Sequence, residues 1–410
     1  MRTATAAVAI PLNQAERAAP LDAAPKAPAG RLPLLGFVTD AATETAILDG
    51  AATAGITPLR VLRGNIGKAI QHLASERSPG ILVVDISGED FPVSRVHDLA
   101  DVCEPAVTVV AVGDSNDVAL YRNLLQAGIT EYLFKPVTPQ LLAKAITDKP
   151  ERSTSLSQKV GKLIACVGAR GGVGTTSIAT GLAWHLANQQ NRRIALADLD
   201  LQHGHCALAL NLKTTPGWRE ALANPMRVDP VFLDRVAAKD GERLAVLSCE
   251  ESLREDLDIT EEAVQTSISV LLGQHHAVIV DVPRVAAAPY RWVLDNADFR
   301  VIVADQTLQS ARDATRLRDA LAEDVDHRNL LVINRAGEAG RRGVPLKEME
   351  SVLELRPNFV IPYEPASFAK AINAGQPPAA TRGRFQHGIA SLAAALYGRQ
   401  AKRRGWWRRR

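Results

Sequence analysis

The sequence has few of the features that mark membrane-spanning and disulfide-stabilised proteins. No run of about 18 apolar residues is free of charge or proline, so no segment is suited to span a bilayer as a helix. Only four cysteines occur among 410 residues, and none are spaced closely enough for a zinc motif or a disulfide framework. A reducing compartment fits this cysteine usage best. We therefore expect a cytoplasmic protein.

Net positive charge is confined to one short segment. The formal net charge is +3, but residues 399–410 hold seven basic residues and no acidic residue, and subtracting seven from +3 leaves −4 for the rest. The charge of the rest of the chain therefore does not indicate a basic surface that binds nucleic acid, and we expect no specific nucleic-acid partner.

The order of apolar runs predicts an α/β protein with two domains. Residues 1–30 have almost no large apolar side chains and are predicted to be disordered. In 31–148, short strand-like runs alternate with helical patterns, which predicts a five-stranded parallel sheet. A polar linker is expected at 149–159. In 160–382, near-continuous Val/Ile/Leu runs predict a larger, mostly parallel sheet buried on both faces, and 383–410 reads as a helix followed by a basic tail.

A glycine-rich loop follows the first strand of the larger domain and precedes a helical pattern. Gly171, Gly172 and Gly174 permit tight curvature, so that successive N–H groups and the helix N-terminus face an anion. Thr176 and Ser177 stand where hydroxyl groups meet magnesium and a phosphate oxygen. The pattern predicts a nucleotide-binding phosphate loop.

This loop resembles that of the MinD/ParA superfamily of deviant Walker A ATPases, which has the form K-G-G-x-G-K-T. Here the segment from Arg170 through Val173 to Thr176 reads RGGVGTT. Arg170 keeps the charge of the first lysine, whereas Thr175 replaces the second lysine, which normally holds the β- and γ-phosphates. Loss of that cation removes charge stabilisation of phosphoryl transfer. The resemblance therefore implies binding of ATP and Mg²⁺ with weak or absent hydrolysis.

Further segments resemble the superfamily in the same order along the chain. The roles that the resemblance implies are Asp198 and Asp281, with Thr176, as magnesium ligands directly or through water, Asp200 as the residue that orients the attacking water, and Asn334, Ile361 and Pro362 as adenine contacts.

The first domain resembles a flavodoxin-like receiver domain. Asp85 ends the third strand at the phosphoacceptor position, and Lys135 follows the fifth strand. The paired acids of receivers appear here as Thr39 and Asp40, and Gly113 replaces a hydroxyl residue. A receiver needs its acid cluster to hold magnesium, so a pseudo-receiver used for docking or dimerisation is favoured. The alternatives are a regulator phosphorylated at Asp85 and a generic α/β domain in which Asp85 is a structural turn residue.

Together the two domains resemble the CpaE/TadZ proteins of the Flp/Tad type IV pilus assembly machinery, over residues 34 to about 380. The resemblance implies an ATP-dependent homodimer that contacts other Tad assembly proteins at the cytoplasmic face of the inner membrane, commonly at a cell pole. The expected function is a nucleotide-regulated localisation scaffold. The alternative is an active positioning ATPase in which Arg170 replaces the missing lysine.

The C-terminal segment has two interpretations. Residues 388–397 form a weakly amphipathic pattern with Ile389, Leu392 and Leu396 on one side, and the tail beyond combines tryptophan with arginine. Such a combination suits the surface of an anionic leaflet, so 388–410 is a candidate peripheral membrane contact. The other interpretation is a final core-packing helix with a solvated basic end.

Overall fold

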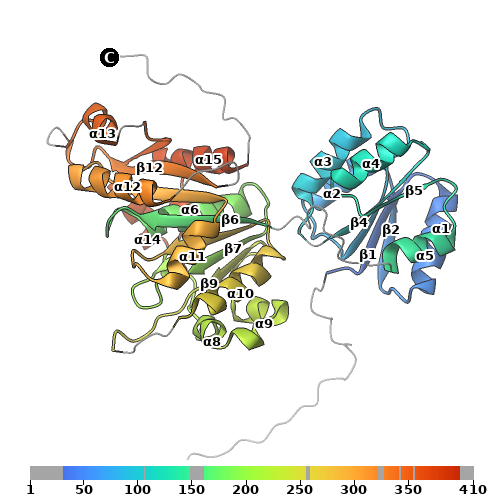
Figure 1. Ribbon diagram of the computed structural model, residues 1–410, viewed down its shortest axis with the longest axis horizontal. Coiled ribbons are helices and arrows are strands. Elements are labelled where there is room, and N and C mark those ends of the chain that lie inside the picture. Colours follow the sequence, from blue (N-terminus) through green and yellow to red (C-terminus); the bar gives the residue numbers. More distant parts are fainter. Residues whose placement is uncertain are drawn as a thin grey trace, which may run out of the picture. The chain divides into compact units, whose positions relative to one another are not determined.

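Two sheets flanked by helices make up the part of the chain that the computed structural model describes (Figure 1). The described residues are 31–105, 107–147, 161–254, 259–321, 327–340, 343–353 and 356–397. The α/β fold with parallel sheets is confirmed. The predictions for residues 1–30, for the linker at 149–159 and for the tail beyond 397 concern residues outside these ranges.

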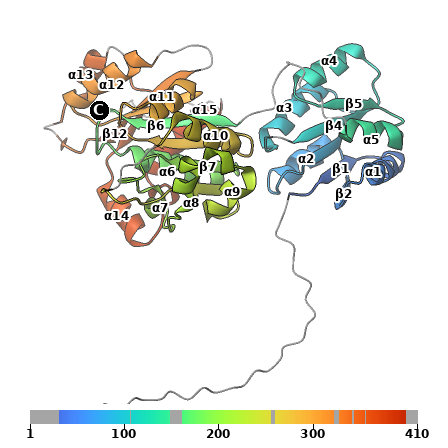
Figure 2. The same cartoon turned by 60° about the horizontal axis from the view of Figure 1, so that its bottom comes forward.

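The smaller sheet has the strand order β2-β1-β3-β4-β5, and every pairing in it is parallel. Its elements are β1 (Leu34–Val38), α1 (Ala41–Thr53), β2 (Leu59–Arg63), α2 (Ile66–Leu73), β3 (Ile81–Asp85), α3 (Pro92–Val102), β4 (Thr108–Gly113), α4 (Val118–Gln126), β5 (Glu131–Phe134) and α5 (Pro139–Thr147). This order is that of flavodoxin-like doubly wound sheets. Helices α1 and α5 cover one face, and α2, α3 and α4 cover the other (Figure 2).

The larger sheet has the order β13-β12-β11-β6-β10-β7-β9-β8. Its strands are β6 (Lys162–Gly168), β7 (Ile194–Asp198), β8 (Ala238–Asp240), β9 (Leu244–Leu247), β10 (Ala277–Val282), β11 (Phe299–Ala304), β12 (Arg328–Ala336) and β13 (Phe359–Pro362). All pairings are parallel except that of β8 with β9. The sequence did not predict β8, because its three residues contain no apolar run.

Helices cover both faces of this sheet. They are α6 (Thr175–Asn188), α7 (Cys206–Ala209), α8 (Gly217–Ala223), α9 (Pro230–Val236), α10 (Glu261–Leu272), α11 (Ala288–Asn296), α12 (Leu308–Ala320), α13 (Leu346–Leu353), α14 (Pro365–Asn373) and α15 (Arg384–Leu396), with short 3₁₀ turns η1 (Pro225–Arg227) and η3 (Pro378–Ala380). In β10, Val278 and Val280 face a core formed with α8 to α13, whereas Ile279 faces a core formed with α6 and α15. Burial on both faces explains the near-continuous apolar strands.

Helix α15 belongs to the core of the larger domain. Ile389 and Leu392 are fully buried and Leu396 is 1% exposed, all in the cluster that contains α6. The boundary predicted at residue 382 therefore excludes a helix that this core needs. The membrane interpretation is wrong for this helix, because its apolar face is covered by protein. No helix in the described ranges is long and apolar enough to cross a bilayer.

Candidate nucleotide and metal site

The glycine-rich loop connects β6 to α6 at the carboxyl edge of the larger sheet. Gly172 and Gly174 have φ values of +79° and +90°, a region that side chains other than glycine adopt at a cost. Gly174 is the N-cap of α6, and no side chain in the described part of the chain caps this helix. Its first N–H groups are therefore left for an anion.

Two side chains from the end of β12 donate hydrogen bonds to carbonyl groups of the loop. The Asn334 amide nitrogen donates to the Val173 carbonyl at 2.9 Å, and the Arg335 guanidinium donates to the Gly172 carbonyl at 2.9 Å. A Cβ atom on Gly174 would lie 2.4 Å from the Asn334 nitrogen. These hydrogen bonds thus fix the conformation of the loop. Asn334 contacts the loop and has only 5% of its surface exposed.

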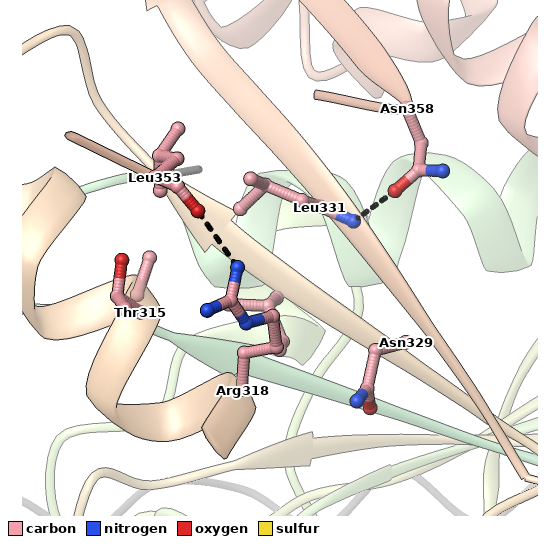
Figure 3. Close-up of a pocket in the computed structure, with 8 residues that line it drawn as sticks. Thr315, Arg318, Asn329, Leu331, Leu353 and Asn358 are labelled. Carbon is pink, nitrogen blue, oxygen red and sulfur yellow. Dashed lines mark hydrogen bonds between the residues drawn. The ribbon is translucent and has the colours of Figure 1, made fainter. Parts of the chain in front are cut away.

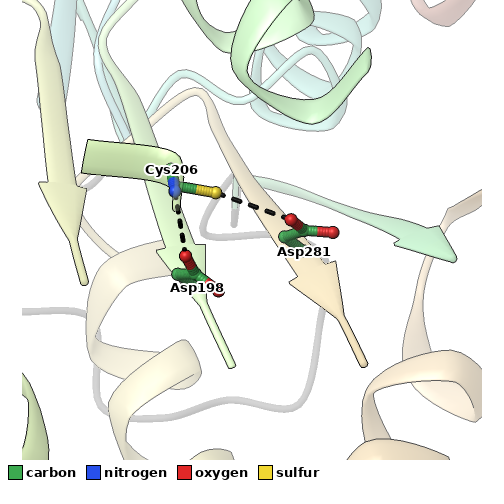
Figure 4. A group of neighbouring side chains, drawn as sticks. All are labelled: Asp198, Cys206 and Asp281. Atoms are coloured by element: carbon green, nitrogen blue, oxygen red, sulfur yellow. Dashed lines mark hydrogen bonds between the residues drawn. The ribbon is translucent and has the colours of Figure 1, made fainter. Parts of the chain in front are cut away.

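Two predicted metal ligands come together where neighbouring parallel strands end. Asp198 of β7 and Asp281 of β10 are opposite each other in register, and both are buried. The Thr176 hydroxyl donates to an Asp281 oxygen at 2.6 Å, which links the phosphate loop to this strand. Cys206 of α7 completes the group, and the three ligand atoms of Asp198, Cys206 and Asp281 lie within 4.8 Å of one another (Figure 4).

Asp200 lies beside this group and is less buried, with 36% of its side chain exposed. Its N–H donates to Asp198 at 3.1 Å, and its carboxylate accepts from the His203 N–H at 3.0 Å. The turn closes with Gly204, whose N–H donates to the Asp200 carbonyl at 2.7 Å. Asp200 therefore lies at the edge of the metal-ligand group, open to water.

The two buried carboxylates repel each other. Burial, and then the charge of Asp198, raise the pKa of Asp281 to about 7, although the hydrogen bonds from Thr176 and Cys206 act in the opposite direction. Burial also raises the pKa of Asp198. A divalent cation would relieve both effects, because it favours the ionised form of each carboxylate.

The oxygen-bearing side chains of this site, those of Asp198, Asp281 and Thr176, fit Mg²⁺. Two carboxylates and a hydroxyl are the oxygen ligands that magnesium prefers. A Cβ atom on Gly204 would lie 2.4 Å and 2.5 Å from the two Asp198 carboxylate oxygens, so only glycine leaves these oxygens uncrowded.

Three similarities to known proteins concern the larger domain. Residues 161–341 match the family model described as cellulose biosynthesis protein BcsQ. The septum site-determining protein MinD of Synechocystis sp. is 26% identical over 204 residues, which are 49% of this chain and 73% of that protein. The structure of a ParA family ATPase from Chlorobium tepidum, 22% identical, covers 58% of this chain and 99% of its own, with a TM-score of 0.52. The larger domain has the MinD/ParA fold.

A fourth similarity is to the structure of a pilus assembly protein CpaE from Caulobacter crescentus. It is 29% identical and covers 28% of this chain and 94% of its own, with a TM-score of 0.26.

The remaining predicted residues of the MinD/ParA-like domain occupy different environments. Arg170 and Ser177 are partly exposed on either side of the loop, and Gly171 is exposed. Ile361 is fully buried, and its side chain packs toward Gly388 of α15. The Ile361 side chain therefore belongs to the core, whereas Pro362 beside it is partly exposed.

Sequence reasoning missed Cys206 as a member of the metal-ligand group. The thiol lies eight positions after Asp198, in a helix of four residues, and no spacing rule marks it. It also missed Trp218, whose indole N–H donates to the Asp198 carbonyl at 2.7 Å. Both contacts depend on how the chain folds back over the strand end.

The smaller domain gathers its predicted residues at the end of β3. The Lys135 ammonium lies 2.7 Å from Asp85 and 2.8 Å from Asp40. Asp85 also accepts from the Thr39 hydroxyl at 2.5 Å, from the Thr39 N–H at 3.0 Å and from the Ser87 N–H at 3.0 Å. Burial acts to raise the pKa of Asp85, but the hydrogen bonds from Lys135, Ser87 and Thr39 outweigh it and lower the pKa.

A cavity of about 160 Å³ lies elsewhere in the larger domain, between α12 and the strands β11 and β12 (Figure 3). Arg318 donates across it to the Leu353 carbonyl at 2.7 Å, and the Asn358 side chain accepts from the Leu331 N–H at 2.7 Å. The cavity includes no residue of the phosphate loop or of the metal-ligand group. Arg318 and Asn358 thus use their polar groups to hydrogen-bond to the main chain around the cavity.

Proposed function

We propose that this chain is an ATP-binding localisation scaffold of the Flp/Tad type IV pilus assembly machinery, with slow or absent hydrolysis. In this proposal nucleotide and Mg²⁺ stabilise a homodimer at the cytoplasmic face of the inner membrane, commonly at a pole, where it contacts other Tad assembly proteins. The pairing of a flavodoxin-like sheet with a MinD/ParA-like domain whose loop reads RGGVGTT supports this choice.

One observation carries the nucleotide part of the proposal. The Thr176 hydroxyl donates to the Asp281 carboxylate at 2.6 Å, which supports a metal site shared by the phosphate loop and the end of β10. Thr175 nevertheless occupies the position of the phosphate-binding lysine, and it begins α6 against the end of β6, where its hydroxyl lies 2.6 Å from the place of a Gly168 Cβ. Binding groups are therefore retained, whereas a cation that stabilises the transition state is missing.

Each residue has a separate role in this proposal. Main-chain N–H groups of the loop and Arg170 bind phosphate oxygens, and the carboxylates of Asp198 and Asp281 with Thr176 hold the metal. Bound Mg²⁺ would supply charge neutralisation between the phosphates and the carboxylates. Asp200, open to water beside this group, orients a water molecule. Pro362 and Asn334 border the expected position of adenine.

Thermal unfolding and phosphate release test the binding without turnover. Mg-ATP at 100 times its Kd is expected to stabilise the protein by about 2.7 kcal/mol, while phosphate release stays at background. Thr176→Val should abolish the shift because it removes the hydroxyl, and Thr180→Val, one helical turn further along α6, serves as the matched control. Rapid turnover that Asp200→Ala abolishes would refute the scaffold. Turnover lost on Arg170→Ala would instead support the positioning ATPase.

The pilus part of the proposal needs a test in cells. Deleting the gene in its own host should abolish surface pili and leave cell division unchanged. Restoring the chain with Thr176→Val should fail to restore pili if nucleotide regulates assembly. A division defect with normal piliation would contradict the assignment.

The contacts of Asp85 favour a pseudo-receiver over a phosphorylated regulator. Both of its carboxylate oxygens already accept hydrogen bonds from Lys135, Thr39 and Ser87, and the side chain is fully buried. Phosphorylation would require these contacts to break first. Purified protein treated with a small phosphodonor is expected to gain no phosphate, and stoichiometric labelling lost in Asp85→Asn would establish the alternative.

A further inference from the structure

Cys206 brings a thiol into a group of ligands that otherwise consists of oxygen. The residue is fully buried, its N–H donates to Asp198 at 3.1 Å, and its sulfur lies 3.6 Å from an Asp281 oxygen (Figure 4). The sulfur thus points toward Asp281, and it lies within 4.8 Å of a carboxylate oxygen of each acid. Cys206 also belongs to the apolar core that contains α6, so its thiol lies at the border between that core and the two acids.

The surroundings of Asp198 hold this arrangement in place. The Ser248 hydroxyl donates to the same Asp198 oxygen at 3.3 Å, and the indole of Trp218 binds the Asp198 carbonyl. Gly204 allows the chain to pass close to the Asp198 carboxylate on its way to Cys206. Buried partners on several sides mean that the ligand group is built by the fold and does not depend on one flexible side chain.

Sulfur changes which cation such a group prefers. Mg²⁺ is a hard ion that takes oxygen ligands, whereas Zn²⁺, Co²⁺ and Cd²⁺ bind thiolate sulfur strongly. We propose that Asp198, Cys206 and Asp281 form a mixed carboxylate–thiolate site that prefers a thiophilic divalent cation of the Zn²⁺ class over Mg²⁺. This inference rests on the proposed function only in that both assign Asp198 and Asp281 to one metal site.

Binding at this site exchanges a proton for the metal. The metal–sulfur bond forms as the S–H bond breaks, and the proton passes to the solvent.

Cobalt spectroscopy on the full chain tests the proposal directly. Titration with Co²⁺ in the absence of nucleotide should produce a thiolate-to-cobalt charge-transfer band that saturates at one equivalent. Zn²⁺ should displace the cobalt at stoichiometric amounts, whereas Mg²⁺ should fail to do so even in large excess. Displacement by Mg²⁺ at comparable concentration, or absence of the band, would overturn the proposal.

Two cysteine variants identify the sulfur. Cys206→Ser should abolish the band and weaken Zn²⁺ binding by more than about tenfold. Even the loss of a residue that only hydrogen-bonds to a metal ligand typically weakens metal binding by about tenfold or more. Cys166→Ser is the matched control: Cys166 is also fully buried and lies opposite Asp281 in the sheet register, but it is not in the ligand group. A band that survives Cys206→Ser would refute the assignment. If that variant fails to fold, Cys206→Ala and the competition between metals for the wild-type chain decide the question.

The outcome is separable from that for nucleotide binding. A cobalt band without any Mg-ATP effect on unfolding would refute the proposed function and leave the thiolate site standing. Binding of Mg-ATP without a cobalt band would refute the thiolate site and leave the proposed function standing.

Discussion

The buried acid at the end of β10 should destabilise the metal-free protein, so that removing its charge makes the protein more stable. Asp281 lies beside Asp198 in the core of the larger domain, and its pKa is raised from 3.8 to about 7. Asp281→Asn keeps the size of the side chain and its ability to accept from Thr176, but it removes the charge. The same change should abolish the stabilisation by metal and nucleotide.

The magnitude follows from the pKa. A rise from 3.8 to about 7 corresponds to about 4 kcal/mol of destabilisation once Asp281 is ionised in the folded state. The folded protein binds the proton more tightly than the unfolded chain, so stability falls as pH rises from about 4 to about 7 and is constant above that. Asp281→Asn should therefore gain about 4 kcal/mol relative to wild type at about pH 8 and little at about pH 4.

Urea unfolding in the presence of a chelator, followed by tryptophan fluorescence, measures this change. Trp184, Trp218 and Trp292 lie in the larger domain, and residues 31–147 contain no tryptophan. Trp218 is fully buried against Asp198, so it contributes to the emission change when the larger domain unfolds. The transition of Asp281→Asn should move to higher urea at about pH 8.

Asp85→Asn is the matched control in the smaller sheet. Asp85 also ends a central strand and is fully buried, but the cation of Lys135 is beside it and its pKa is lowered. Its contribution is present above its unfolded-state pKa and is lost as pH falls through the lower folded-state value. The control is followed by circular dichroism, because residues 31–147 contain no tryptophan, and it should be less stable than wild type at neutral pH. An Asp281→Asn variant that is less stable than wild type at about pH 8 would refute the reasoning.

Three further changes follow from single contacts. Gly204→Ala would place a carbon 2.4 Å from an Asp198 oxygen, so it should remove the effect of Mg-ATP on thermal unfolding, whereas Gly273→Ala at the end of α10, where the nearest atom would be 3.5 Å away, should not. Lys135→Met leaves two carboxylates without their cation and should cost about 3 kcal/mol in urea unfolding followed by circular dichroism; a loss below about 1 kcal/mol would contradict the buried ion pair. Leu392→Ala in α15 should cost about 3 kcal/mol, and the exposed Arg384→Ala should cost little; equal effects would mean that α15 is not part of the core.

The sequence alone predicted the strands and the loop because both are encoded locally. Apolar runs such as ILVVD and AVIVDV predict buried strands, and acids at their carboxyl ends predict a shared edge because parallel strands end together. Closely spaced glycines before a helix predict an anion site from backbone geometry alone. The pairing of Asp198 with Asp281, and of Lys135 with Asp85, was predictable for that reason.

Only the tertiary structure decided the features that depend on contacts between distant segments. The apolar side of 388–397 suits a membrane surface or a protein core equally well, and the core was decided by the packing of α15 on α6. Strand β8 forms because β9 offers it an edge. Cys206 lies beside the carboxylates because the chain turns at Gly204 and passes over the end of β7. Neither hydropathy nor residue spacing predicts such a turn.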